Sequence, residues 1–177
     1  MNCARLEANI RDMMEEQQLK LGYMKETVRL YYPLTSLNRF LELECSEDEM
    51  QQCLHTFCKE VKTRLGSVSV SNKGERFCIV IPPEGAEYVH LQGNSNRFLA
   101  ELIELVRKHG TTMEDVLALF SRCSSNVVQR KMSHGEFDYL VYFEDGKPDA
   151  YYYCIANEGH HVTYHRYTKE DYDDFGF

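Results

Sequence analysis

The chain has 177 residues, of which 43% are hydrophobic, and a formal net charge of −8. This profile is typical of one globular domain, and no window approaches the roughly 18 consecutive apolar residues of a membrane-spanning helix. The charged N-terminus lacks the apolar run of a secretory signal, and the seven cysteines form no C-x-x-C pair. We therefore predict a cytoplasmic protein, not bound to membranes, whose cysteines are all reduced.

Helical periodicity dominates the first third of the sequence. Helices are expected at 2–21, 34–41 and 46 to about 64. Thr35 or Ser36 is expected to cap the second helix, and Ser46 and Glu49 have the spacing of a capping box at the start of the third. The stretch 26–32 is compatible with a short strand and with a helical turn, and the sequence leaves both open.

Strand patterns follow the third predicted helix. We expect strands at 67–71, 76–81 and 87–91, of which the second is a continuous apolar run typical of a central strand. Turn residues occupy 72–74 and 82–85, between these strands. The predicted connections are short, so neighbouring strands should pair antiparallel.

The second half repeats the order of helices followed by strands. The segment NSN at 94–96 predicts the cap of a helix that ends at Gly110, and a second helix should start in TTMED at 111–115 and run to about 123. Four strands joined by hairpin-like connections are then expected at 126–132, 137–143, 150–156 and 161–167, followed by a short helix at 169–174.

These elements predict an α+β fold. The expected architecture is an antiparallel β-sheet of about seven strands in two meanders, packed by about four to six helices, in a single domain over 1–177. The sequence does not decide whether the two meanders form one sheet or two.

Two stretches carry a resemblance to a known family: KLGYMKETVRLYYPLTSLNRFLELE at 20–44 and FDYLVYFEDGKPDAYYYCI at 137–155. With them the chain resembles a family of uncharacterised bacterial cytosolic proteins, a domain of unknown function, over its whole length. The resemblance implies a single-domain protein and supplies no activity, ligand or site residue.

The segment EGHHVTYHRY at 158–167 holds three of the seven histidines. Its β-branched and aromatic residues predict a strand, on which His160 and His161 point to opposite faces. His161 and His165 share a face but lie about 13 Å apart at ~3.3 Å per residue, too far to hold one ion at about 2.0–2.1 Å each. We expect neither a metal nor a cofactor, and interpret these as sheet histidines.

Enzyme motifs are missing from the sequence. No G-x-S-x-G, P-loop or dinucleotide-binding glycine pattern is present, and the spacing of Cys53, His55 and Cys58 suits neither a zinc site nor a redox pair. Cys123, after a predicted helix, is a candidate reactive thiol only if a histidine lies beside it. The sequence therefore favours a non-enzymatic protein.

Arg29 and Arg39 flank Pro33 and the predicted start of a helix. Free N–H groups and a guanidinium would together bind a phosphate or carboxylate. The alternative is that both arginines pair with nearby acids such as Glu26 or Glu42. An anion site here, joined to the C-terminal histidines, is the basis of a second hypothesis, a small enzyme or ligand-binding domain.

The charge and the tyrosines are concentrated near the C-terminus. Residues 136–177 carry ten acids and three bases, a net charge of −7, and six of the twelve tyrosines lie in the final 27 residues. The negative charge argues against nucleic acid as a partner. The alternatives are a solvated acidic surface and aromatic pairs that only stabilise a half-exposed sheet.

Acids around aromatics also form an interface of one charge sign. Our first hypothesis is therefore a protein-binding domain that binds a basic protein, or a second copy of itself, through an exposed patch on the C-terminal sheet. The patch is predicted to comprise Tyr142, Tyr152, Tyr164, Asp138, Asp171, Asp173 and Asp174.

Overall fold

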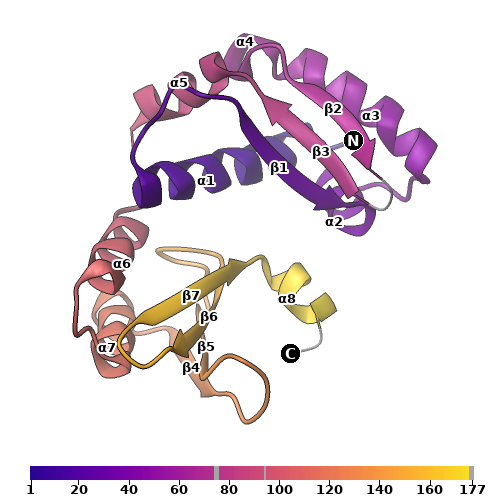
Figure 1. Cartoon of the computed structure of the whole chain (residues 1–177). Coiled ribbons are helices and arrows are strands. Elements are labelled where there is room, and N and C mark those ends of the chain that lie inside the picture. The colour runs from indigo at the N-terminus through magenta and orange to yellow at the C-terminus, as the bar shows by residue number, and fades with distance from the viewer. Residues whose placement is uncertain (74–75, 94, 176–177) are drawn as a thin grey trace. The chain divides into compact units, whose positions relative to one another are not determined.

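The computed structural model describes residues 1–73, 76–93 and 95–175, and within them the chain forms eight helices and seven strands (Figure 1). All strand pairs are antiparallel, in one sheet of three strands and one of four, which confirms the predicted α+β class. The chain divides into two compact units, Met1–Asn94 and Ser95–Phe177, each with one sheet. Whether the two units act as one domain, as the sequence predicts, stays a prediction.

The first unit contains five helices and three strands. They are α1 (Cys3–Leu21), β1 (Val28–Pro33), α2 (Leu34–Leu41), α3 (Glu47–Glu60), α4 (Lys62–Leu65), β2 (Ser69–Lys73), β3 (Arg76–Ile81) and α5 (Pro83–Gln92). The open question at 26–32 is resolved as a strand, which pairs with β3 in the sheet order β1-β3-β2. As predicted, the apolar run 76–81 is the central strand. One core joins the helices to this sheet, with Leu37, Phe57 and Phe77 fully buried.

The strand predicted at 87–91 and the turn predicted at 82–85 are both wrong, because this segment is helix α5. Pro83 stands at the first helical position, where its fixed φ favours a helix and its missing N–H is not needed. Gly85 lets the helix approach α4 closely, since a Cβ there would lie 2.5 Å from the carbonyl oxygen of Leu65. Together with the break between α3 and α4 at Val61, α5 accounts for the two helices beyond the six predicted.

Helix caps explain where several helices begin. The Glu49 carboxylate accepts hydrogen bonds from the Ser46 backbone N–H at 2.9 Å and its hydroxyl at 2.7 Å, which confirms the predicted capping box of α3. Neither Thr35 nor Ser36 caps α2, because that helix already begins at Leu34, directly after Pro33. Of the turn expected at 72–74, residues 72 and 73 belong to strand β2, so the prediction is wrong there, and residue 74 lies outside the described residues.

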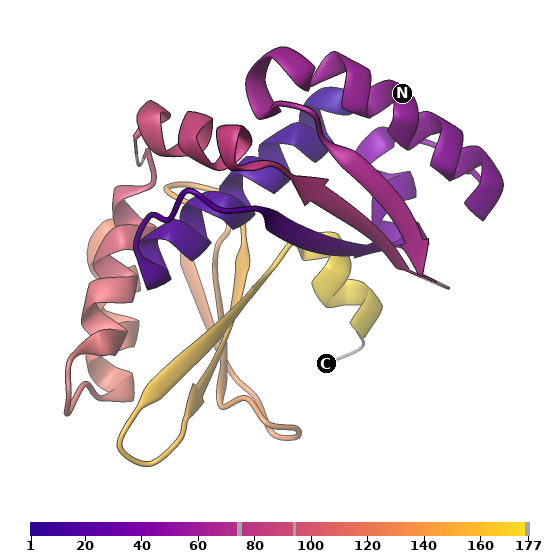
Figure 2. The same cartoon turned by 45° about the horizontal axis from the view of Figure 1, so that its top comes forward.

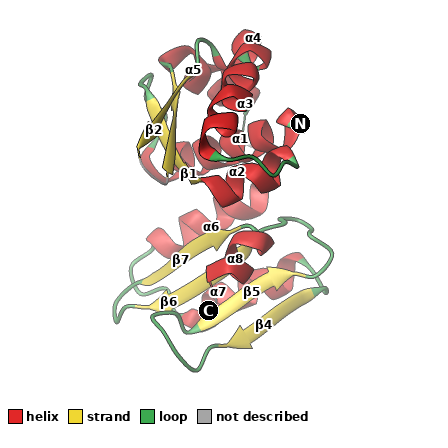
Figure 3. Cartoon of the chain, turned by 90° about the vertical axis from the view of Figure 1, so that its right-hand side faces the viewer, coloured by secondary structure: helices red, strands yellow, loops and turns green. Residues whose placement is uncertain are grey.

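The second unit is a four-stranded meander with three helices. Its elements are α6 (Arg97–Arg107), α7 (Met113–Cys123), β4 (Val127–Lys131), β5 (Tyr139–Phe143), β6 (Tyr152–Asn157), β7 (Val162–Tyr167) and α8 (Lys169–Phe175). All seven were predicted at these places, within a few residues, and the sheet order is β4-β5-β6-β7 (Figure 3). The two meanders of the sequence are therefore two sheets.

One face of this sheet, which we call the inner face, is covered by α6 and α7. Phe98 of α6 and Phe120 of α7 lie 4.8 Å apart between ring centroids. Phe98 packs edge-on against Phe143 and Tyr153 of the sheet, and Phe120 packs edge-on against Tyr153 and stacks on Phe143. Phe120 and Tyr153 are fully buried. Figures 1 and 2 show α6 and α7 side by side along this face, which leaves the other face of the sheet for α8.

Candidate functional site

The outer face of the four-stranded sheet is the side opposite α6 and α7. Strand register decides which residues share it: Leu140 pairs with Cys154, and Tyr152 pairs with Tyr167. Alternation then places Tyr142 on the same side. Leu140 and Cys154 are buried at its centre, where burial raises the pKa of the Cys154 thiol to about 11. The outer face thus has an apolar floor with half-buried tyrosines around it.

Two of the predicted tyrosines lie beside this apolar floor on the outer face. The rings of Tyr142 and Tyr152 are stacked, with 4.2 Å between centroids and 13° between planes. Tyr172 of α8 adds a third ring, 5.4 Å from Tyr152. Figure 3 shows α8 lying across the sheet on the side away from α7. Strand pairing and the C-terminal helix therefore gather tyrosines from three elements into one aromatic cluster.

Of the acids predicted to border the patch, those of α8 lie beside this cluster, whereas Asp138 lies at the other end of β6 from Tyr152. Thr168 caps α8 by accepting from the Asp171 N–H at 3.1 Å, and Asp173 and Asp174 are exposed in its last turn. Asp138 precedes β5 and accepts a hydrogen bond at 2.7 Å from the Asn157 N–H of β6. Asp138 is thus held by the sheet, whereas the acids of α8 stand beside the tyrosines.

Burial favours the protonated form of these phenols. Partial burial is the main cause that raises the pKa of Tyr152, and neighbouring Tyr142 and Asp173 raise it further. Burial likewise raises the pKa of Tyr167 and Tyr172. Each phenol is therefore a neutral group with one O–H donor at neutral pH. The negative charge of this region comes from the carboxylates alone.

The prediction that Tyr164 belongs to the same exposed patch is wrong. Tyr164 pairs with Ile155, so it lies on the inner face, where it is 8% exposed and contacts Tyr153 at 5.7 Å between ring centroids. Alternation along one strand separates two faces but does not say which residues of the next strand share them. Tyr164 is a core residue.

The histidines near the C-terminus are exposed. His160 and His161 precede β7, and His165 lies within it on the outer face, 5.3 Å from the ring of Phe137. The predicted strand is confirmed at 162–167. Among the residues that the structure describes, no three His, Cys, Asp or Glu side chains gather as a metal ion would require.

The two arginines of the predicted anion site lie in the first unit. Arg29 is exposed on β1, opposite Val80 of β3. Arg39 lies in the last turn of α2 and donates to the Ser36 hydroxyl at 3.3 Å. Of the acids named as alternative partners, Glu42 pairs with Arg5. The C-terminal histidines lie in the second unit, so the anion-site hypothesis draws on residues of both units.

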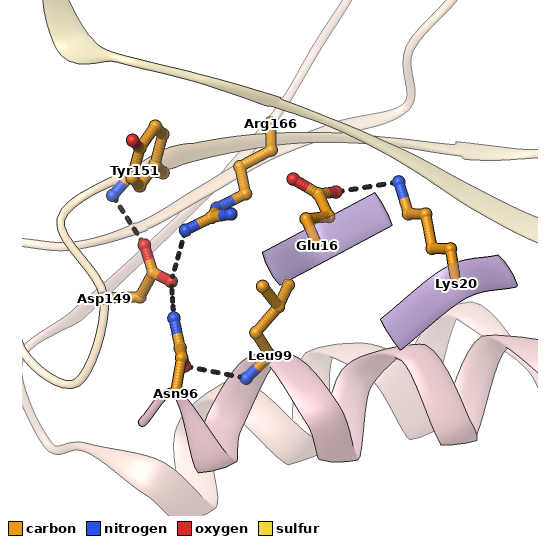
Figure 4. Close-up of polar contacts among 7 residues, drawn as sticks. All are labelled: Glu16, Lys20, Asn96, Leu99, Asp149, Tyr151 and Arg166. Carbon is orange, nitrogen blue, oxygen red and sulfur yellow. Dashed lines mark hydrogen bonds and ion pairs between the residues drawn. The ribbon is translucent and has the colours of Figure 1, made fainter. Parts of the chain in front are cut away.

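A buried polar cluster on the inner side of the second unit was not predicted (Figure 4). Asp149, in the connection between β5 and β6, pairs with Arg166 of β7 at 3.1 Å, and their side chains are 1% and 3% exposed. Asp149 also accepts from the Tyr151 N–H at 2.9 Å and from the side chain of Asn96. The Arg166 guanidinium lies 3.9 Å above the centre of the Tyr151 ring.

This cluster connects three parts of the second unit by hydrogen bonds: the start of α6, the connection between β5 and β6, and strand β7. Asn96 caps α6 by accepting from the Leu99 N–H at 2.9 Å, as predicted, and at the same time binds Asp149. Val162 and Tyr164 are buried on the inner face, and alternation adds Arg166 to them. A buried arginine needs an acid to pair with it. The sequence signal for this cluster was therefore Arg166, which alternation in the predicted strand places on the same face as Val162 and Tyr164. With these hydrogen bonds made, we interpret the cluster as structural.

Comparison with known proteins gives one family. The family model described as "Domain of unknown function, E. rectale Gene description (DUF3877)" matches residues 3–176. No curated protein and no solved structure matches the chain. In the described part of the chain, no helix has the length and apolar character needed to cross a membrane.

Proposed function

We propose a function from the geometry of this chain, which belongs to the family described as a domain of unknown function (DUF3877). The protein is a non-enzymatic binding module for a basic protein segment. The binding surface is the outer face of the four-stranded sheet together with α8. The observation that carries the proposal is the stacked pair Tyr142–Tyr152 beside the acids of α8.

The aromatic cluster supplies contact area. Tyrosine presents a large rigid ring with a polar tip and loses little conformational entropy on binding, which is why interfaces are enriched in it. Tyr142, Tyr152 and Tyr172 are each half-buried, so part of each ring still faces solvent. Phe175, at the end of α8, is 61% exposed and adds apolar area beside Tyr167, 5.4 Å away between ring centroids.

The charge selects the partner. Residues 127–175, which form the sheet and α8, carry ten acids and five bases, a net charge of −5, and the mutual pairing of Asp149 and Arg166 leaves this sum unchanged. One of these bases, Arg130 of β4, pairs with Leu140 and lies on the outer face. A rim of carboxylates attracts lysine and arginine side chains and speeds their association at low salt. Two copies of the chain would bring like charges together, so a basic partner is favoured over self-association.

No specific observation favours the second hypothesis, an enzyme or ligand-binding domain at Arg29 and Arg39. Arg29 is an exposed residue on a strand, as solvated arginines commonly are, and the half-buried Arg39 already donates to Ser36. The anion site remains a prediction from the sequence.

Peptide selection tests the proposal without a known partner. A random peptide display library is selected on the full chain and counter-selected on a Tyr142→Ser/Tyr152→Ser variant. The proposal predicts that the surviving peptides carry a net positive charge and apolar residues. Surviving peptides with no charge bias, or the loss of every binding peptide in the counter-selection, would contradict it.

We also propose that the protein works in the cytoplasm. All seven cysteines are free in the structure, which suits a reducing compartment. Thiol titration of the purified, denatured protein without reductant should find seven thiols. A count of five would reveal a native disulfide and overturn this location.

A further inference from the structure

Two cysteines of the first unit lie next to each other. The Sγ atoms of Cys45 and Cys53 are 3.9 Å apart, although neither sequence spacing nor motif marks them as a pair. Cys45 directly precedes the cap residue of α3, and Cys53 lies in the second turn of that helix. We propose that Cys45 and Cys53 are a modification site that forms a reversible disulfide when the protein meets hydrogen peroxide.

The Asn38 side chain holds the backbone of Cys45 in place for this reaction. Asn38 of α2 accepts a hydrogen bond from the Cys45 N–H at 2.8 Å, and its side-chain amide donates to the Cys45 carbonyl oxygen at 3.0 Å. Cys53 is fixed by the helix that carries it. A disulfide requires the two sulfurs to approach from 3.9 Å to about 2.05 Å, so the pair is in contact but must still close before it bonds.

A third cysteine nearby is held out of the reaction. Cys3 of α1 interacts electrostatically with Cys53 and hydrogen-bonds the side chain of Glu60. Burial first, and then that hydrogen bond, raises the pKa of the Cys3 thiol to about 12. Cys3 therefore stays protonated and bound to a carboxylate at neutral pH, whereas Cys45 has a sulfur as its neighbour.

The chemistry with hydrogen peroxide balances as follows. The thiolate of one cysteine attacks a peroxide oxygen, the O–O bond breaks, and a sulfenic acid forms while hydroxide leaves and takes up the proton that the thiol lost. The sulfur of the second cysteine then attacks the sulfenic sulfur, the S–S bond forms, the S–O bond breaks, and water leaves with the second thiol proton. One peroxide is reduced to two waters, and the two thiols are oxidised to one disulfide.

The environment sets the pH dependence of this reaction. Partial burial, followed by the contact with Cys53, raises the pKa of the Cys45 thiol. A raised pKa means that less thiolate is present at neutral pH than in an ordinary cysteine, so oxidation is slow there and accelerates as the pH rises. The pair is thus suited to sustained oxidation and not to fast peroxide sensing. A disulfide would tie the first turns of α3 to the chain that leads into it.

Thiol counting and peptide mapping test the proposal on the full chain. After treatment with hydrogen peroxide, the thiol count should fall from seven to five, the intact mass should drop by two hydrogen atoms, and digestion should yield a reducible Cys45–Cys53 link. Cys58→Ser is the matched control, because Cys58 lies on the same helix and should leave the link unchanged. In Cys45→Ser, oxidation should add oxygen and form no link.

Three outcomes would overturn the proposal. Wild-type protein could keep all seven thiols under conditions that fully oxidise glutathione. The link could map to Cys3–Cys53 or to another pair. Oxidation in urea could give the same Cys45–Cys53 link as in the folded protein, which would show that the fold does not direct it. The map of the wild-type protein decides the question even where a variant fails to fold.

Discussion

Removing the carboxylate of Asp149 should destabilise the second unit strongly. Asp149 is 4% exposed and accepts hydrogen bonds from three groups: the Arg166 guanidinium, the Tyr151 N–H and the Asn96 side chain. In Asp149→Ala all three bonds are lost, and Arg166 loses the acid that pairs with it inside the protein.

The magnitude follows from burial. A hydrogen bond to a charged group contributes roughly 1.5–3 kcal/mol, and removal of one partner of a buried ion pair costs about 3–5 kcal/mol. We expect the free energy of unfolding to fall by about 3–5 kcal/mol, a large share of the roughly 5–15 kcal/mol of a typical domain. Asn96 still caps α6 through the Leu99 N–H, so the start of that helix should survive.

Urea denaturation followed by circular dichroism measures this loss, and hydrogen exchange of peptides from 95–177 assigns it to the second unit. Asp145→Ala is the matched control, because Asp145 lies in the same connection and also accepts two hydrogen bonds, yet is exposed. Its midpoint should shift far less. If Asp149→Ala does not fold, the same measurement is made on Asp149→Asn. A loss below about 1 kcal/mol in Asp149→Ala, or equal shifts in both alanine variants, would refute the reasoning.

Two further predictions concern the first unit. Gly85→Ala should lower the free energy of unfolding of this unit by about 1–3 kcal/mol, because the new Cβ would lie 2.5 Å from the Leu65 carbonyl oxygen. An unchanged melting temperature would show that α5 packs less closely against α4. Ser46→Ala should cost about 1 kcal/mol in urea denaturation through loss of the α3 cap. The hydrogen bonds from Ser46 lower the pKa of the Glu49 carboxyl below its ordinary value of 4.5. The ionised Glu49 therefore stabilises the fold fully above pH 4.5, and this stabilisation is lost as the pH falls through the lowered pKa of the folded state. The difference in unfolding midpoint between wild type and Glu49→Gln should therefore shrink in acid, and a constant difference would contradict this account.

Most helices and strands follow from local sequence patterns. The seven elements after residue 95 were all predicted, because hairpin connections and caps such as Asn96 are signals within a few residues. Helix α5 was not, because Pro82, Pro83 and Gly85 favour a turn as readily as a helix start. What decides for the helix is the close packing of Gly85 on Leu65, a contact that no local pattern encodes.

The candidate site was predicted in part for a similar reason. Tyr142 and Tyr152 share a face as expected, but Tyr164 does not, because strand register sets which residues face together. The pair Asp149–Arg166 joins two segments 17 residues apart and depends on the same register. The sequence therefore predicts which residues of one strand share a face of the sheet. Which residues of neighbouring strands share that face is known only from the structure.

The affinity of a selected basic peptide for matched tyrosine variants tests the proposed function most directly. Dissociation constants are measured by fluorescence anisotropy for wild type, for Tyr142→Ser/Tyr152→Ser and for Tyr31→Ser, whose ring is 50% exposed in the first unit. Circular dichroism verifies that each variant is folded. The account predicts at least about tenfold weaker binding by the double variant, unchanged binding by Tyr31→Ser, and weaker binding by wild type as salt is raised. Equal affinities for all three folded proteins would contradict it.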